Sequence, residues 1–361
     1  MTNVQTCRVP VTKLMYARTK HTKSLSVVSH KLNTDQTQNQ LIKCHTNSLD
    51  VDKMSQCTNK LLMIRPVRFG FNPETAIDNA FQQLDDSVTP KDVQKKALEE
   101  FDTFVNKLKE CGVSVHVVQD TLNPHTPDSI FPNNWISFHD DFTICIYPMA
   151  AKTRRLERKS CVLQYIEQVF QVKTVLDLSR YEQFGKFLEG TGSMVLDRTH
   201  RIAYASISER TDEELFEKFC KLMGFKPVTF HSEDEFGKAI YHTNVMMCIA
   251  DKYAIVCLEA LKDPSEREML RKELEDSGKV VISLVYKQMN NFGGNMLQVK
   301  VKGGNNLCVM STKAYESLDF EQIAKIEKFD TILHSDLTTI EANGGGSARC
   351  MIAEIFLPLN T

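Results

Sequence analysis

The strongest constraint on this sequence is a helix-to-strand unit that returns five times after residue 60. Each copy combines an amphipathic helix, a short stop and a strand rich in β-branched residues. The strands are predicted to begin near Val113, Lys173, Lys226, Lys279 and Asp330, at steps of 60, 53, 53 and 51 residues. A period of this length predicts a closed or stacked array of similar units.

The clearest copy spans residues 89–118. Thr89 is the predicted N-cap of its helix, Pro90 lies in the first turn and Gly112 ends the helix in a left-handed conformation. One face of this helix is apolar and is predicted to be buried: Val93, Ala97, Leu98, Phe101, Val105 and Leu108.

A second copy, residues 211–230, repeats this plan. A capping box from Thr211 to Glu214 is predicted to begin its helix, and Gly224 to end it. Residues 263–284 form a third copy, and residues 153–178 and 319–337 are weaker ones.

Every copy is accompanied by one polar residue at an equivalent point. These residues are Asn134, Glu189, His242, Asn295 and Cys350, at spacings of 55, 53, 53 and 55. In units arranged around an axis they converge on one pocket, whereas in a doubly wound open sheet they would lie in a row. Kelch blades have a similar period but contain no helix. The pattern therefore favours a closed α/β array with a central site.

The charge balance and the cysteines exclude several classes of protein. The 44 basic and 46 acidic residues leave no excess of positive charge for nucleic acid. The sequence contains neither a run of 18 apolar residues nor a signal-peptide core, so it predicts neither a membrane partner nor secretion. The 11 cysteines form no C-x-x-C pair, so neither a disulfide framework nor a zinc site is expected. We expect an intracellular protein, with the cytoplasm favoured.

The N-terminal segment differs from the rest of the chain. Residues 1–34 contain six Lys or Arg, no acidic residue and many Ser and Thr. This composition is typical of a flexible tail and also of a mitochondrial transit peptide. The predicted organisation is an extension or targeting segment over residues 1–58, followed by one catalytic domain over residues 59–361.

An ordered set of motifs between residues 60 and 361 resembles the guanidino-group-modifying enzymes, or penteins. The motifs are "DSIFPNN" (128–134), "RR" (154–155), "EGTGS" (189–193), "SERT" (208–211), "HTN" (242–244) and "GGGSARC" (344–350). The superfamily includes arginine deiminases, dimethylarginine hydrolases and amidinotransferases, and the run looks most like the citrulline-utilisation hydrolase branch. The resemblance implies a five-fold pseudo-symmetric α/β propeller of ββαβ units, without metal or cofactor.

The resemblance also implies roles for the motif residues. Cys350 would be the nucleophile, with the glycine loop and Arg349 favouring its thiolate. His242 would protonate the leaving amine and then activate water, and Glu189 would hold the planar substrate group. Arg210 would bind the substrate α-carboxylate. The implied substrate-binding set is Asp128, Asn133, Asn134, Arg154, Arg155, Arg210, Asn244 and Asn295.

Two departures from the deiminase pattern bear on the substrate. Deiminases carry an acidic residue where this chain has Asn134, and an Asp where it has Asn244. Amides suit a neutral ureido group better than a guanidinium, because an amide can donate as well as accept. The favoured reaction is therefore hydrolysis of citrulline to ornithine. Asp128 leaves arginine deimination open, with amidino transfer as a further alternative.

Two hypotheses of other kinds remain. A non-catalytic binding protein of the same fold would sense a small amino acid, but it would have no need of Cys350, His242 and Glu189 together. A nucleotide-binding Rossmann protein is set aside because "GTGSMV" lacks a third glycine and leads into a strand. The sequence does not fix the oligomeric state, for which a homodimer is one option.

Overall fold

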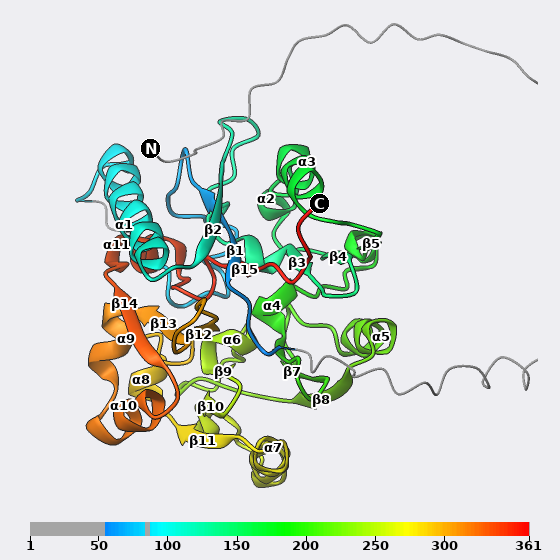
Figure 1. The fold of residues 1–361 in the computed structure, drawn as a ribbon, viewed down its shortest axis with the longest axis vertical. Helices are drawn as coiled ribbons and strands as arrows, with labels where there is room; N and C mark the ends of the chain where they lie inside the picture. The colour runs from blue at the N-terminus through cyan, green and yellow to red at the C-terminus, as the bar shows by residue number, and fades with distance from the viewer. Residues whose placement is uncertain (1–54, 84–86, 361) are drawn as a thin grey trace, which may run out of the picture. The chain divides into compact units, whose positions relative to one another are not determined.

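The computed structural model describes residues 55–83 and 87–360. These residues form five sheets of three strands each, which follow one another around a centre in chain order (Figure 1). In every sheet the first strand pairs antiparallel with the middle strand, and a helix then leads to a third strand that pairs parallel with the middle one. This is the predicted α/β propeller of ββαβ units.

The strands and helices repeat in the same order in each sheet. The first strands are β3 (Ile136–Phe138), β6 (Val195–Asp197), β9 (Met247–Ile249), β12 (Leu297–Val299) and β15 (Ala353–Glu354). The middle strands are β4 (Thr143–Ile146), β7 (Ile202–Ser206), β10 (Tyr253–Val256), β13 (Leu307–Ser311) and β1 (Lys60–Arg65). The third strands are β5 (Thr174–Asp177), β8 (Lys226–Phe230), β11 (Val280–Ser283), β14 (Thr331–Ser335) and β2 (Ser114–Gln119).

The helices that precede the third strands are α3 (Ser160–Val169), α5 (Glu213–Met223), α7 (Pro264–Asp276), α10 (Phe320–Glu327) and α1 (Pro90–Glu110). All five predicted helix-to-strand units are therefore present. The shorter helices are α2 (Lys152–Arg155), α4 (Gly190–Ser193), α6 (Thr243–Met246), α8 (Tyr286–Met289), α9 (Thr312–Ser317) and α11 (Thr338–Gly344). The 3₁₀ helices are η1 (Pro132–Asn134), η2 (Ser179–Phe184) and η3 (Leu258–Ala260).

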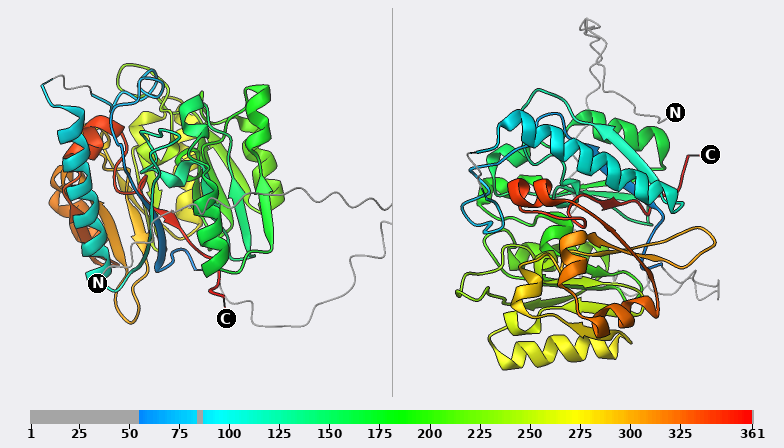
Figure 2. Two further views of the ribbon diagram at one scale, coloured as in Figure 1. Left: turned by 90° about the horizontal axis from the view of Figure 1, so that it is seen from above. Right: turned by 90° about the vertical axis from the view of Figure 1, so that its left-hand side faces the viewer.

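The two ends of the described chain meet in one sheet. The last strand, β15, pairs antiparallel with β1, with Leu61 opposite Glu354 and Leu62 opposite Ala353. Figure 2 shows these two strands, blue and red, next to each other. The fifth unit is therefore assembled from both ends, which closes the array.

Helix boundaries follow local capping, with one correction to the sequence prediction. Thr89 caps α1 as expected, with its side chain accepting from the N–H of Asp92. Helix α5 begins one residue later than the capping box predicted, because Asp212 rather than Thr211 accepts from the N–H of Leu215. Gly224 ends α5 at a φ of 70°, as expected.

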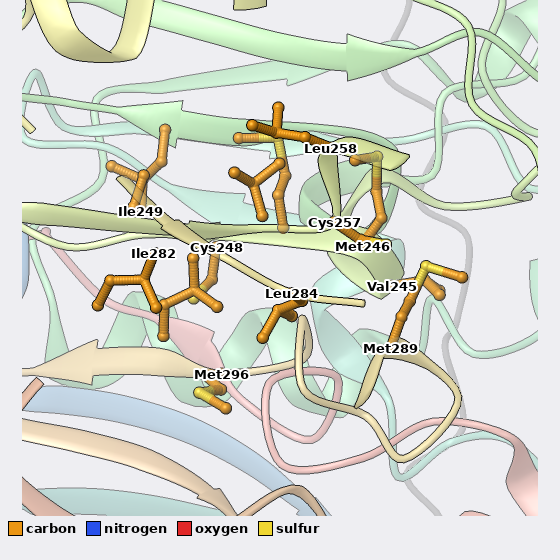
Figure 3. Packing of buried hydrophobic residues seen from close by; sticks show 14 of the residues in the cluster. Val245, Met246, Cys248, Ile249, Cys257, Leu258, Ile282, Leu284, Met289 and Met296 are labelled. Carbon is orange, nitrogen blue, oxygen red and sulfur yellow. The ribbon is translucent and has the colours of Figure 1, made fainter. Parts of the chain in front are cut away.

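The core lies between the sheets and the helices that cover them. On α1 the buried face includes Phe104, which the sequence prediction missed, whereas Leu98 is only partly buried. A large apolar cluster joins the three sheets formed by β6–β8, β9–β11 and β12–β14, and Figure 3 shows Val245 and Met289 next to each other within it. The nine cysteines within the described ranges are all free.

The packed part of the chain begins before the predicted boundary at residues 58 and 59. Gln56, Cys57 and Thr58 are buried, and the Gln56 side chain donates to the carbonyl of Leu196 in β6 over 2.9 Å. The predicted targeting segment, residues 1–34, lies outside the described residues. Within residues 55–83 and 87–360, no helix is long and apolar enough to cross a membrane.

Candidate active site

The structure brings the five periodic polar residues together at the centre of the array. Each lies just before the first strand of its sheet: Asn134 in η1, Glu189 and His242 at the N-caps of α4 and α6, Asn295 before β12 and Cys350 before β15. Figure 1 shows α4 and α6 near the centre of the ring of sheets. All five side chains are buried.

Two amide side chains contact the Cys350 sulfur. The distances from Sγ to Nδ2 are 3.2 Å for Asn295 and 3.6 Å for Asn244. Exchanging the oxygen and nitrogen of the Asn295 amide would break a hydrogen bond, because its Oδ1 accepts from the backbone N–H of Arg349 over 3.1 Å. Both amides present N–H groups to the sulfur in this structure. The role predicted for Asn295 was contact with substrate, and the structure adds this contact with the sulfur.

Arg349 differs from the sequence interpretation, whereas the glycines lie at the Cys350 cavity. The Arg349 guanidinium turns away from the sulfur and bonds the carbonyl of Ile352 and the Glu354 carboxylate. A Cβ on Gly344 would lie 2.7 Å from the Phe131 ring, so the absence of a side chain allows the ring to pack there. The amides of Asn244 and Asn295, rather than the Arg349 guanidinium, contact the sulfur.

His242 and Glu189 form a buried pair. Nε2 of His242 lies 2.8 Å from Oε2 of Glu189, and the other carboxylate oxygen accepts from the N–H of Ala150 over 2.9 Å. Burial opposes ionisation of Glu189, but Arg210, His242 and Arg154 together hold its pKa well below the usual range. Burial lowers the pKa of His242, although Glu189 opposes this shift. The resting pair is a carboxylate and a neutral imidazole, with Nδ1 as the basic nitrogen.

Arg154 fixes the orientation of Asn134. Its Nη1 donates to Oδ1 of Asn134 over 2.7 Å, and its Nε and Nη2 donate to both oxygens of Glu157. Because guanidinium nitrogens only donate, the amide oxygen of Asn134 must face Arg154. The Nδ2 atom then lies on the side of His242: a Cβ on Gly192 would be 2.4 Å from this atom and 2.8 Å from His242 Nδ1.

Asp128 lies beside this group. Its Oδ2 accepts from Asn72 over 2.7 Å and is 3.9 Å from Nε of Arg154. Its Oδ1 has no hydrogen-bond partner among the described residues. Burial raises the pKa of Asp128, and Arg154, Asn72 and Arg210 oppose that rise.

Arg210 is held by a residue that the sequence analysis missed. Asp78 accepts from both Nε and Nη2 of this guanidinium, Thr75 accepts through its carbonyl over 3.1 Å, and Glu189 lies 3.5 Å away. The guanidinium also stacks over Tyr241 at 4.8 Å. Asp78 and Thr75 lie between β1 and α1, a segment without an equivalent in the other repeats. Periodicity therefore gave no signal for them.

Two predicted substrate-binding residues neither line the cavity at Cys350 nor hydrogen-bond its sulfur. Arg155 donates to the carbonyls of Met149 and Ala150 and pairs with Glu182 at 3.5 Å. Asn133 is fully buried, and neither polar atom of its side chain has a partner within the described ranges. Neither residue lines the cavity at Cys350.

The cavity at Cys350 is small, about 20 Å³, which is room for roughly one water molecule. Its walls come from the segments before α1, α5 and α6, from η1 and the residues before it, from α2 and from the glycine loop: Thr75, Asn79, Asp128, Phe131, Asn134, Arg154, Arg210, Tyr241, His242, Gly344, Gly345, Gly346 and Cys350. No group of three His, Cys, Asp or Glu residues that could hold a metal ion occurs in the described part of the chain.

Comparison with solved structures supports the fold. The substrate-bound N-terminal domain of ArgZ, an arginine dihydrolase from the ornithine-ammonia cycle in Cyanobacteria, is 18% identical with a TM-score of 0.65, and the match covers 83% of this chain and 98% of that one. AgrE in complex with L-arginine is 18% identical with a TM-score of 0.63, over 83% of this chain and 40% of that one.

A third structure is a variant of a dimethylarginine dimethylaminohydrolase as its adduct with S-methyl-L-thiocitrulline. It is 14% identical with a TM-score of 0.57, and the match covers 82% of this chain and 99% of that one. No curated protein matches the chain. The model of the family N,N dimethylarginine dimethylhydrolase, eukaryotic, matches residues 65–357. This chain therefore belongs to the eukaryotic N,N dimethylarginine dimethylhydrolase family, hydrolases of guanidino C–N bonds within the pentein superfamily of guanidino-modifying enzymes.

Proposed function

We propose that this enzyme hydrolyses the ureido group of a free amino acid, citrulline, to give ornithine. The observation that carries the proposal is the orientation of Asn134, whose oxygen is taken by Arg154 and whose N–H groups are left for the substrate. A guanidinium has only donors and would meet these N–H groups with its own. A ureido oxygen can accept from them.

A second amide completes the match to a ureido group. Nδ2 of Asn244 is directed at the Cys350 sulfur, and its Oδ1 has no partner among the residues described. This oxygen and the Glu189 carboxylate can accept from the ureido N–H groups. Donor and acceptor are thus both available, as a group with one C=O and several N–H bonds requires.

The first chemical step forms a covalent adduct. His242 takes the proton of the Cys350 thiol, and the thiolate attacks the ureido carbon. The bond from this carbon to its terminal nitrogen breaks, and the imidazolium gives its proton to the leaving ammonia. A thiocarbamate then links Cys350 to the ornithine nitrogen. Glu189, 2.8 Å from His242, stabilises the imidazolium during the transfer.

Water completes the reaction. His242 takes a proton from water, the hydroxide attacks the thiocarbamate carbon, and the bond to sulfur breaks. The proton returns to the Cys350 sulfur, and the released N-carboxyornithine loses carbon dioxide to give ornithine. Arg210 is the proposed partner of the substrate α-carboxylate. Asp78 holds that guanidinium in this structure, so we expect substrate to displace the Asp78 carboxylate from it.

The test is to incubate the full-length protein with citrulline and, separately, with arginine, and to measure ornithine, citrulline and ammonia. We expect ornithine and one equivalent of ammonia from citrulline, and no product from the Cys350→Ser variant. A Cys350→Ser variant with full turnover would eliminate the mechanism. A wild-type protein that binds citrulline but never converts it would favour a sensor instead.

A second candidate is hydrolysis of arginine or of an N-methylated arginine. It is favoured by the buried Asp128, whose Oδ1 is without a partner in the described chain and can accept from a guanidinium N–H. Family membership and the arginine-bound neighbours point the same way. Release of ammonia or a methylamine from these compounds, with citrulline as the product, would establish this candidate over the first.

A further inference from the structure

A second, larger cavity lies beside the one at Cys350. It has a volume of about 450 Å³ and is bounded by residues 78–83, by the loop before α6, by α8 and by α11. Tyr241 lines both cavities, but Cys350, His242 and Glu189 do not line the larger one. The larger cavity, which we call the second pocket, has the volume usual for small-molecule sites.

The walls of the second pocket are apolar and partly aromatic. Phe81 and Phe292 face each other with ring centroids 5.0 Å apart, and Tyr241 supplies a third ring. Val245 and Met289 add aliphatic surface, and Figure 3 shows them next to each other within the core cluster. Aromatic faces of this kind attract cations as well as apolar groups.

A buried carboxylate with a free oxygen lines this apolar pocket. Glu341 on α11 is 2% exposed; its Oε1 accepts from the Ser347 hydroxyl over 2.5 Å, whereas its Oε2 has no hydrogen-bond partner among the described residues. Burial raises the pKa of Glu341 to about 7, although the Ser311 and Ser347 hydroxyls and Lys313 oppose the rise. A buried carboxylate in this position would gain from a cationic partner.

The charges around the pocket also favour a cation. Asp78, Asp234 and Glu235 join Glu341 in the lining, against two lysines. Lys313 lies over the Phe292 ring at 5.3 Å, and Lys238 donates to the carbonyl of Ile77 over 3.3 Å. Asp78 is already paired with Arg210, so three carboxylates remain against two ammonium groups and leave the lining with a small acidic excess.

We infer that the second pocket binds a small organic cation with an apolar body, such as an alkylammonium or alkylguanidinium compound. The cationic head would bond Oε2 of Glu341, and the alkyl body would lie against Phe81, Phe292 and Met289. This site is distinct from the Cys350 cavity, so it does not depend on which substrate the enzyme converts.

The test is calorimetric titration of the full-length protein with butylammonium chloride and with 1-butanol at pH 8, where the Glu341 carboxylate is ionised. We expect the cation to bind at least about tenfold more tightly than the alcohol, a difference of roughly 1.4 kcal/mol. Glu341→Gln should weaken binding of the cation at least tenfold. Glu189→Gln, the matched change at the carboxylate that contacts His242 beside the Cys350 cavity, should leave the affinity for the cation within about twofold.

A second variant guards against a change in the fold. Ala239 is exposed and lines the pocket, so Ala239→Trp should occupy space there and abolish cation binding without replacing any residue of α11. The inference is overturned if Glu189→Gln abolishes binding while Glu341→Gln and Ala239→Trp do not, which would put the cation in the Cys350 cavity. It is equally overturned if wild-type protein shows no binding at millimolar cation.

Discussion

Side-chain amides control the polarity of the site around Cys350. Arg154 takes the oxygen of Asn134, and the N–H of Arg349 takes the oxygen of Asn295. The free N–H groups of Asn134 are therefore left for the substrate, and those of Asn295 face the Cys350 sulfur. A donor placed in this way selects a carbonyl oxygen over an N–H group, since burying two facing donors costs about 1–3 kcal/mol.

Replacement of Asn134 by Asp tests this selection directly. Asn134→Asp removes the N–H donor and places a carboxylate beside Arg154, so kcat/KM for citrulline should fall by roughly 10-fold to 100-fold. The ratio of kcat/KM for arginine to that for citrulline should rise, because a carboxylate accepts from guanidinium N–H groups. Initial rates with both substrates measure the ratio. An unchanged ratio would show that Asn134 does not read the substrate.

Gly192 keeps space open between Asn134 and His242. The Cβ of Gly192→Ala would lie 2.4 Å from Asn134 Nδ2 and 2.8 Å from His242 Nδ1, closer than real contacts allow. We expect kcat to fall by roughly 10-fold to 100-fold because the base and the donor are displaced. Gly70→Ala is the matched control, since nothing lies within 4 Å of its Cβ. Equal activity of the two variants would rule out this packing role.

The buried pair of His242 and Glu189 predicts an acid limb in the pH profile. Burial lowers the pKa of His242, so the neutral base should persist below pH 6.5, its ordinary value, and kcat/KM should fall only at lower pH. Glu189→Gln removes the charge and hydrogen bond that oppose the shift. The limb should therefore move to still lower pH, and kcat should drop roughly 100-fold. Movement of the limb toward higher pH would contradict this assignment.

At this scale the sequence predicted residue positions better than side-chain directions. The constant spacing placed Asn134, Glu189, His242, Asn295 and Cys350 at equivalent points, because each copy of the repeat meets the axis in the same way. The Arg349 guanidinium points away from the Cys350 sulfur because it pairs with Glu354, and no sequence pattern reveals this ion pair. Asp78 could not be found because it has no counterpart in the other repeats.

Among the elements, helix α11 links the glycine loop to the rest of the domain. The Glu341 side chain accepts from Ser347, and its backbone carbonyl accepts from the N–H of Gly345 over 2.9 Å. The five long helices were predicted because caps and an apolar face mark them. Helix α11 and the short helices α4 and α6 carry no such amphipathic period, so sequence patterns did not show them. Their positions depend on contacts between sheets.

Burial of Glu341 predicts a pH dependence of stability. Its pKa is raised to about 7 in the folded protein, above the ordinary carboxyl value, so the folded state binds more protons than the unfolded state between about pH 4.5 and 7. The free energy of unfolding should therefore decrease as the pH rises through this range, by up to about 3 kcal/mol.

Urea unfolding of Glu341→Gln at several pH values measures this contribution. The free energy of unfolding of the variant should lack the part of the decrease that comes from Glu341. The variant should therefore be more stable than wild type near pH 8. Glu99→Gln is the matched control, because Glu99 is an exposed glutamate on α1. A parallel dependence in wild type and Glu341→Gln would assign the effect to other groups.

For the molecule as a whole, closure depends on the start and the end of the described chain. Strand β15 pairs with β1 and contacts β3, and the first strands β6 and β12 both contact β9. Gln56 lies where these strands meet: it donates to the carbonyls of Leu196 in β6 and Ile249 in β9, and accepts from the N–H of Arg198. The sequence predicted the closed array from its period, but composition could not show that residues 55–58 belong to it.

These contacts predict where the chain can be shortened. A chain that begins at Ser55 keeps Gln56 and Thr58, so its Tm and its turnover should match those of the full chain. A chain that begins at Asn59 loses Gln56 and also Thr58, whose hydroxyl donates to the carbonyl of Ile355 over 2.9 Å. Several buried backbone groups would then lack partners, at about 1–3 kcal/mol each.

Thermal unfolding of the two shortened chains makes the comparison. The chain that begins at Asn59 should melt about 5–10 °C lower, given the size of the domain and a loss of several kcal/mol. Gln56→Ala in the full chain should reproduce a large part of this drop, because it removes the same three hydrogen bonds without shortening the chain. Equal melting of the two shortened chains would mean that the array closes without Gln56, and that pairing of β1 with β15 is enough to hold it.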